Sequence, residues 1–207
     1  MRKLVVVLLT GFLIISLLGC SQTPSQQDNN VQNNGSINEQ NNRDEQQNNK
    51  EQIDSQPSLA GLCLGDSVTK VNEILGNTFE ETAYDVAGHY PESYIVREYA
   101  EGVTVILGQD SLTVFELRTT KAPFTTNLGV KVGDSAKDVL NLYRANYEEP
   151  ESIHGGQLLG VFKLENGCAL IFDFNIEDGL YNPEPIADED QVERIVLTTP
   201  TFLDDSF

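Results

Sequence analysis

Apolar residues after position 57 recur with two different periods along the chain. Two segments space them at three and four residues, as one buried helix face does, and six shorter segments rich in β-branched and aromatic residues predict strands. Each helical segment follows a Gly-Asp-Ser tripeptide, in which glycine permits a tight turn and aspartate or serine suits a helix N-cap. The helical segments carry Val68, Val71, Ile74 and Leu75, then Ala136, Val139, Leu140 and Tyr143. The predicted strands cover 93–99, 103–107, 112–118, 158–164, 168–174 and 192–198.

The same order of motifs occurs twice. Residues 59–67 align without a gap with residues 127–135, and residues 114–120 resemble residues 192–199. Self-similarity of this length indicates one supersecondary unit that is used twice. We therefore expect an internal duplication.

The two expected units are residues 57–126 and 127–207. Each is predicted to be a short helix followed by a three-stranded antiparallel meander, so together they predict an α+β fold with one layered domain. Gly76 suits the end of the first helix. Residues 175–191 contain prolines and a run of acids, and they predict an acidic insertion in the second unit.

The chain begins with a pattern typical of secretory signal peptides. Arg2 and Lys3 precede an apolar run over residues 4–18. The run is too short for a comfortable membrane span but has the length of a signal-peptide core. We expect residues 1–19 to be removed on export.

The end of this run, Leu-Leu-Gly-Cys at positions 17–20, resembles a bacterial lipobox. The resemblance implies cleavage before Cys20 by lipoprotein signal peptidase and a diacylglyceryl group on the Cys20 thiol. Two acyl chains give stable membrane anchoring where one gives marginal binding. The expected location is therefore extracytoplasmic, lipid-anchored to the bacterial cell membrane. An ordinary signal peptide with an incidental cysteine is the alternative.

Residues 20–56 have a different composition from the rest of the chain. Asn and Gln make up 18 of the 36 residues after Cys20, and aliphatic side chains are rare. Too little apolar surface is present to offset the entropy of ordering, so the segment predicts a disordered tether behind the lipidated cysteine. As a flexible coil it would span about 30–35 Å.

The chain carries 32 acidic and 13 basic residues, which gives a formal net charge of −19. Residues 57–147 carry −5 and residues 148–207 carry −12. This acidity excludes nucleic acid as a partner, because phosphate contacts need a basic surface. Three cysteines and two histidines leave little material for a metal site or a thiol enzyme, and we expect no cofactor.

The layout of residues 58–200, with two Gly-Asp-Ser helix starts behind a lipobox, is similar to the tandem helix-then-meander superfamily. That superfamily includes the β-lactamase inhibitor protein, the SmpA/OmlA-like lipoproteins of the outer-membrane assembly machine and lipoproteins of Gram-positive bacteria. Its members present a sheet face or loops to another protein. The resemblance implies a surface-anchored, non-enzymatic lipoprotein that binds another protein or an envelope component, or alternatively an inhibitor of a secreted enzyme.

The Gly-Asp-Ser motifs also resemble the nucleophile motif of one class of serine hydrolase, with Ser67 and Ser135 as candidates. That class needs a histidine near the C-terminus with an aspartate three residues before it. His154 has Glu151 in that position, and the other histidine is His89. A serine without its base is inert, so we expect both serines to be helix caps.

Residues 173–190 match part of a calcium-binding loop. Asp173 and Glu177 occupy ligand positions of that template, but Asp178 stands where the loop needs glycine. A Ca²⁺ site that uses Asp173, Glu177 and Asp178 is one interpretation. A solvated acidic loop is the other.

Cys63 and Cys168 belong to the exported part of the chain, where an oxidising compartment permits a disulfide. The bond requires both thiols to face each other, and two separate thiols are the alternative. Four tyrosines offer either an exposed aromatic patch for a protein or glycan partner, or packing within the core. These are Tyr84, Tyr90, Tyr94 and Tyr99.

Overall fold

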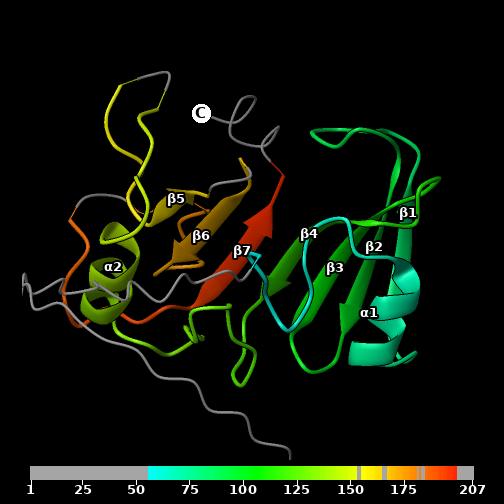
Figure 1. Cartoon of the computed structure of the whole chain (residues 1–207), viewed down its shortest axis with the longest axis horizontal. Coiled ribbons are helices and arrows are strands. Elements are labelled where there is room, and N and C mark those ends of the chain that lie inside the picture. Colours follow the sequence, from blue (N-terminus) through cyan, green and yellow to red (C-terminus); the bar gives the residue numbers. More distant parts are fainter. Residues whose placement is uncertain (1–55, 153–154, 165–166, 181, 183–184, 200–207) are drawn as a thin grey trace, which may run out of the picture. The chain divides into compact units, whose positions relative to one another are not determined.

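In the part of the chain that the structure describes, seven strands form a single antiparallel sheet in the order β1-β2-β3-β4-β7-β6-β5, and two helices accompany it (Figure 1). This computed structural model describes residues 56–152, 155–164, 167–180, 182 and 185–199. The helices are α1 (Val68–Leu75) and α2 (Ala136–Arg144). The strands are β1 (Glu80–Tyr84), β2 (Tyr94–Tyr99), β3 (Val103–Gly108), β4 (Val114–Thr119), β5 (Val161–Lys163), β6 (Ala169–Asp173) and β7 (Arg194–Thr198).

Both helices begin where the sequence predicts. The Ser67 hydroxyl accepts a hydrogen bond from the Lys70 amide, and the Ser135 hydroxyl accepts one from the Asp138 amide. Gly76 ends α1 with a φ of 83°, a conformation that costs glycine little. The expected caps of both helices and the expected end of α1 are therefore confirmed.

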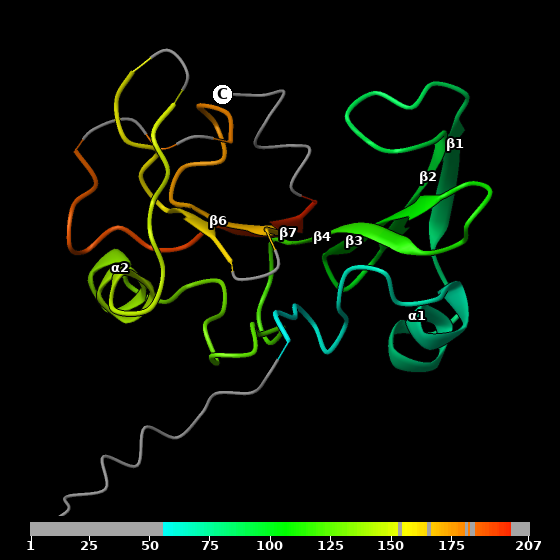
Figure 2. The same ribbon diagram turned by 45° about the horizontal axis from the view of Figure 1, so that its top comes forward.

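Both helices pack against the same face of the sheet (Figure 2). Val71 of α1 and Tyr143 of α2 belong to one buried cluster with Leu117 of β4 and Leu197 of β7. The Tyr143 hydroxyl donates to Thr126 Oγ1 at 2.9 Å, which satisfies its polar end inside this core. A single core therefore lies between the helices and the sheet.

The loop before each helix is bonded to the segment that carries the last strand of its half. In both halves a glycine N–H donates to a valine carbonyl, and the same valine donates to an aspartate carbonyl. Backbone hydrogen bonds thus join each helix start to the sheet in the same way in both halves. The bonds are Gly65 to Val114 (2.8 Å) and Val114 to Asp66 (2.9 Å), then Gly133 to Val192 (2.8 Å) and Val192 to Asp134 (2.9 Å).

The α+β class is confirmed, but two regular units of one helix and three strands are not. The structure contains one strand, β1, that the sequence did not predict. Among the described residues, four strands therefore follow α1, whereas three follow α2. All five residues of β1 are exposed. Cross-strand pairs hold β1 in place instead. Arg97 Nε lies 2.7 Å from Glu81 Oε2, and the rings of Tyr84 and Tyr94 stack with their centroids 4.8 Å apart.

The predicted acidic insertion, residues 175–191, lies between β6 and β7. Its described residues form turns and one isolated bridge between Gln191 and Ser135. Across the described ranges, no helix is both long and apolar enough to cross a membrane. The predicted signal peptide, Cys20 and nearly all of the tether lie outside the described residues.

Candidate functional site

The face of the sheet opposite the helices, which we call the helix-free face, is built by alternate residues of the strands. Directly paired residues of antiparallel strands point to the same side, so the register decides which side chains meet. Two rows of paired residues cross this face from β1 to β7. One row is Thr82, Val96, Ile106, Glu116 and Thr198, and the other is Glu80, Glu98, Thr104, Arg118 and Val196.

The helix-free face changes from covered to accessible along the sheet. At the β5 end, Val161, Ile171 and Val196 are buried in a small apolar cluster. At the other end, β1 is fully exposed and most of β2 is half-buried. The accessible part therefore runs from β1 to Arg118 of β4, whose side chain is 41% exposed. In Figure 2, the β1–β2 loop rises on the side of the sheet away from the helices.

Glu116 lies at the centre of this face with its side chain buried. Its carboxylate accepts hydrogen bonds from the Tyr90 hydroxyl at 3.0 Å and from the Thr198 hydroxyl at 2.7 Å, and it pairs with Nε of Arg118. A buried carboxylate is tolerated when charged and neutral donors satisfy it in this way. These contacts join the β1–β2 loop, β4 and β7 at the carboxylate of Glu116.

The surroundings of Tyr90 keep its hydroxyl protonated. Burial raises the pKa of Tyr90 well above its ordinary value, and the negative charge of Glu116 raises it further. The hydroxyl therefore remains a hydrogen-bond donor to Glu116 throughout the physiological pH range.

A bulge in β4 brings another aromatic ring onto this face. The β3–β4 register shifts between Ile106 and Leu107, which leaves Phe115 without a partner in β3. The Phe115 ring stacks on Tyr90, with centroids 5.9 Å apart. A Cβ atom at Gly108 would lie 2.0 Å from Glu92 Oε1, 2.3 Å from Ser111 Oγ and 2.5 Å from the Phe115 ring, so a larger residue there would displace these side chains.

An aromatic row links the edge of the sheet to its centre. Tyr84 stacks on Tyr94 at 4.8 Å, and Tyr94 meets Tyr90 edge-on at 4.9 Å. Tyr84 is 41% exposed, whereas Tyr90 and Tyr94 are half-buried. Tyr99 does not join them, because it lies in the core beside the helices and packs on Phe79. The structure thus gathers three of the four tyrosines singled out from the sequence.

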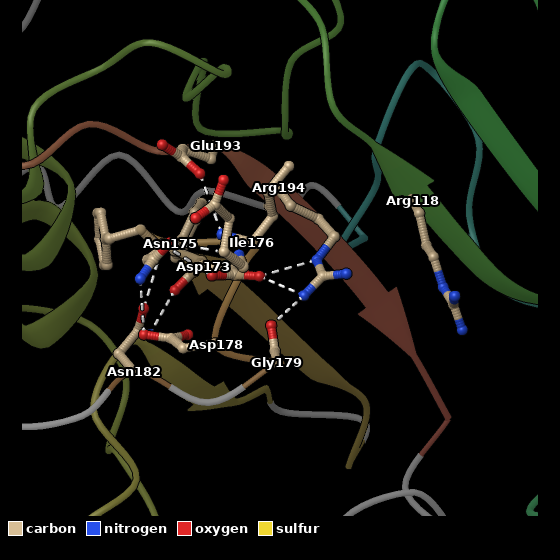
Figure 3. A network of polar contacts seen from close by, with 12 residues as sticks. Arg118, Asp173, Asn175, Ile176, Asp178, Gly179, Asn182, Glu193 and Arg194 are labelled. Atoms are coloured by element: carbon tan, nitrogen blue, oxygen red, sulfur yellow. Dashed lines mark hydrogen bonds and ion pairs between the residues drawn. The ribbon is translucent and has the colours of Figure 1, made fainter.

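A second polar network lies where β6 meets β7 (Figure 3). Asp173 is fully buried, and its Oδ2 receives Nε of Arg194 at 2.8 Å and also Nη2 of the same guanidinium. The Asn175 amide donates to Asp173 Oδ1 at 3.0 Å, and Arg194 donates to the Gly179 carbonyl. Arg118 extends from β4 away from this network.

These contacts bear on the calcium hypothesis. Both oxygens of Asp173 already accept hydrogen bonds, and Glu177 and Asp178 are exposed on the turn that follows β6. Asp178 accepts a bond from the Asn175 side chain at 2.9 Å. In the part of the chain that the structure describes, no group of three or more His, Cys, Asp or Glu could hold a metal ion. The geometry favours the solvated acidic loop.

The two cysteines of the domain are separate thiols. Cys63 is half-buried in the loop before α1, Cys168 is buried just before β6, and neither forms a disulfide. Burial, and next the charge of Asp66, raises the pKa of the Cys63 thiol. A raised pKa lowers the thiolate fraction, so Cys63 is a poor nucleophile.

Ser67 and Ser135 lie at the starts of different helices, and each hydroxyl caps its own helix. His89 lies in the β1–β2 loop, and His154 lies outside the described residues. The expectation that both serines are caps is confirmed. No arrangement of nucleophile and base is seen within the described ranges.

No protein-family model, curated protein or solved structure matches this chain. The geometry of the helix-free face therefore carries the functional argument. Sequence reasoning missed Glu116 and Arg118, the two charged residues at its centre. One signal could have revealed Glu116, because this glutamate lies between the apolar residues Phe115 and Leu117 of a predicted strand.

Asp173→Ala is expected to lower the free energy of unfolding by about 3–5 kcal/mol, because it leaves the half-buried Arg194 without its partner. Asp188→Ala is the matched control, since Asp188 pairs with Lys137 at the surface and both side chains are more than half exposed. Its expected loss is below about 1 kcal/mol. Urea denaturation measures both, and equal losses would contradict a structural role for the Asp173 pair.

Tyr90 predicts how stability depends on pH. The folded state raises the pKa of Tyr90 above the value of about 10 for an unfolded tyrosine, so only the unfolded state loses this proton near that pH. Stability should therefore fall as pH rises above about 10. Tyr90→Phe is expected to make that fall less steep in urea denaturation between about pH 9 and 11. An unchanged slope would argue against the buried contact with Glu116.

Proposed function

We propose that this chain is a lipoprotein of a bacterial cell envelope, held outside the cytoplasm by a diacylglyceryl group on Cys20. Its folded unit binds another protein or an envelope component and catalyses no reaction. The charged start, the apolar run and the Leu-Leu-Gly-Cys ending of residues 1–20 support the anchor. The Asn- and Gln-rich residues 21–56 suit a spacer between lipid and domain.

The observation that carries the binding function is the accessible part of the helix-free face. Three tyrosines and Arg118 gather there on a sheet whose other side is covered by helices. Aromatic residues and arginine are enriched at protein interfaces. The bonds to Glu116 hold the surface in one arrangement, so little conformational entropy would be lost on binding.

The finer fold forms part of the same proposal. We infer that residues 57–126 and 127–207 are duplicated units, related to the tandem helix-then-meander superfamily. The matching backbone bonds at both helix starts support this inference. So does the strand order, because β2, β3 and β4 mirror β5, β6 and β7 about the β4–β7 pair. On this view β1 is an addition to the first unit.

The alternatives have weaker support. An inhibitor of a secreted enzyme would use the same face and differs only in its partner. A calcium-binding surface protein needs Asp173, whose oxygens are engaged with Arg194 and Asn175. A serine hydrolase needs Ser67 or Ser135, whose hydroxyls cap helices. Surface binding therefore remains the function that the geometry supports best.

The test uses the full chain in bacterial cells. Mass spectrometry of the membrane-bound product should show a first residue Cys20 that carries a diacylglyceryl group. Chemical cross-linking in the same cells should capture a partner on the helix-free face. Thr104→Arg, which adds a long side chain beside Arg118, should reduce that adduct by about tenfold, equivalent to about 1.4 kcal/mol.

Asn141→Arg is the matched control, because it adds the same side chain at an exposed position of α2 on the other side of the sheet. It should leave the adduct unchanged. An unmodified Cys20 would refute the anchor. Equal adduct levels in both variants would refute binding through the helix-free face.

A further inference from the structure

The outer edge of β1 is an open strand edge. Its five residues are exposed, and no segment among the described residues pairs with the side of β1 that faces away from β2. The opposite edge of the sheet differs, because β5 has only three residues and its Lys163 amide bonds to the Glu148 carbonyl. Unpaired N–H and C=O groups along an edge are a template for another strand.

Two glutamates sit directly opposite each other at one end of this edge. Glu80 of β1 pairs with Glu98 of β2 in the register, and both side chains are exposed on the helix-free face. Within the described chain, neither carboxylate has a hydrogen bond or a basic partner. Like charges in directly opposed positions destabilise a sheet. In the neighbouring pair, by contrast, the glutamate faces a basic residue, because Arg97 Nε lies 2.7 Å from Glu81 Oε2.

The other end of β1 on the same face is apolar. Tyr84 stacks on Tyr94 and keeps 41% of its surface exposed, and Val86 beyond it is 67% exposed. Glu80 and Tyr84 are four residues apart, which corresponds to about 13 Å along a strand. The edge therefore offers an acidic position and an apolar position on one face, with a free backbone between them.

We propose that β1 binds an extended cationic segment of a partner protein, which adds to the sheet as a further strand. A Lys or Arg of that segment lies opposite Glu80 and also neutralises Glu98. An aromatic or aliphatic residue lies opposite Tyr84. Every neighbouring pair in this sheet is antiparallel, so the segment runs antiparallel to β1, and its apolar residue precedes its basic residue by four positions. This inference rests on the proposed binding function and names its partner chemistry.

The net negative charge of the domain favours a cationic segment over a second copy of the domain or an anionic lipid surface. Residues 57–207 contain 26 acidic and 9 basic side chains, so a second copy of the domain or an anionic lipid surface would be repelled. A cationic segment is instead attracted from a distance. In strand addition, the main-chain bonds supply affinity and alternate side chains supply selectivity.

The experiment uses residues 21–207, which include the whole compact unit from Lys50 to Phe207. The probe is the capped peptide Thr-Tyr-Thr-Val-Thr-Lys-Thr, added to ¹⁵N-labelled protein. We expect amide shifts centred on β1 and slower hydrogen exchange along that strand. Replacing the peptide's Lys by Glu should weaken binding at least tenfold, which corresponds to about 1.4 kcal/mol.

A double variant, Glu80→Gln with Glu98→Gln, should weaken binding of the Lys peptide about fivefold, because it removes the acidic pair. The matched control, Glu101→Gln with Asp110→Asn, removes two exposed acids from neighbouring turns and should leave affinity unchanged. Shifts away from β1, equal binding of both peptides, or equal losses in both double variants would overturn the proposal. A dimer detected by sedimentation would also overturn it if the copies pair through β1.

The two proposals can fail separately. If Thr104→Arg abolishes cross-linking in cells while the peptide leaves β1 unaffected, the binding function stands and the β1 site is wrong. If the peptide binds β1 as expected but no partner is captured in cells, the β1 site stands and the cellular function is wrong.

Discussion

The pairing of β4 with β7 is the interaction on which the rest of the structure depends. Four residue pairs join these strands, and the Thr198 hydroxyl donates to Glu116 from 82 residues away in the chain. Without this seam, the strands that follow α1 and those that follow α2 would form two small sheets with unpaired edges. With the seam, both helices cover one core and the opposite face continues across the sheet.

The seam also determines what the helix-free face can offer. Glu116 is itself part of the seam, paired with Thr198, and its buried carboxylate contacts both Tyr90 and Arg118. Removing a charge from water costs free energy, and here three donors offset that cost. The result is a surface with fixed aromatic and charged groups at its centre and an open strand at its edge. A surface that is fixed before a partner arrives loses little conformational entropy on binding.

Features that depend on neighbouring residues could be predicted from the sequence. The Ser67 and Ser135 caps and all six predicted strands are present, although the strand bounds differ. β1 could not be predicted, because its polar residues are held by cross-strand pairs rather than by burial. The helix-free face could not be predicted either, since it depends on the register between distant strands. The calcium template matched Asp173 by spacing alone, whereas Arg194, 21 residues away, occupies its carboxylate.

The central claim is that the two halves form one sheet with one continuous helix-free face. Native-state hydrogen exchange on residues 21–207, followed at increasing denaturant, tests it most directly. The account predicts that the bonded amides between β4 and β7 exchange only through global unfolding, with the same free energy as those between β2 and β3 and between β6 and β7. Exchange across the β4–β7 seam at a clearly lower free energy would mean that the halves separate, and would contradict the account.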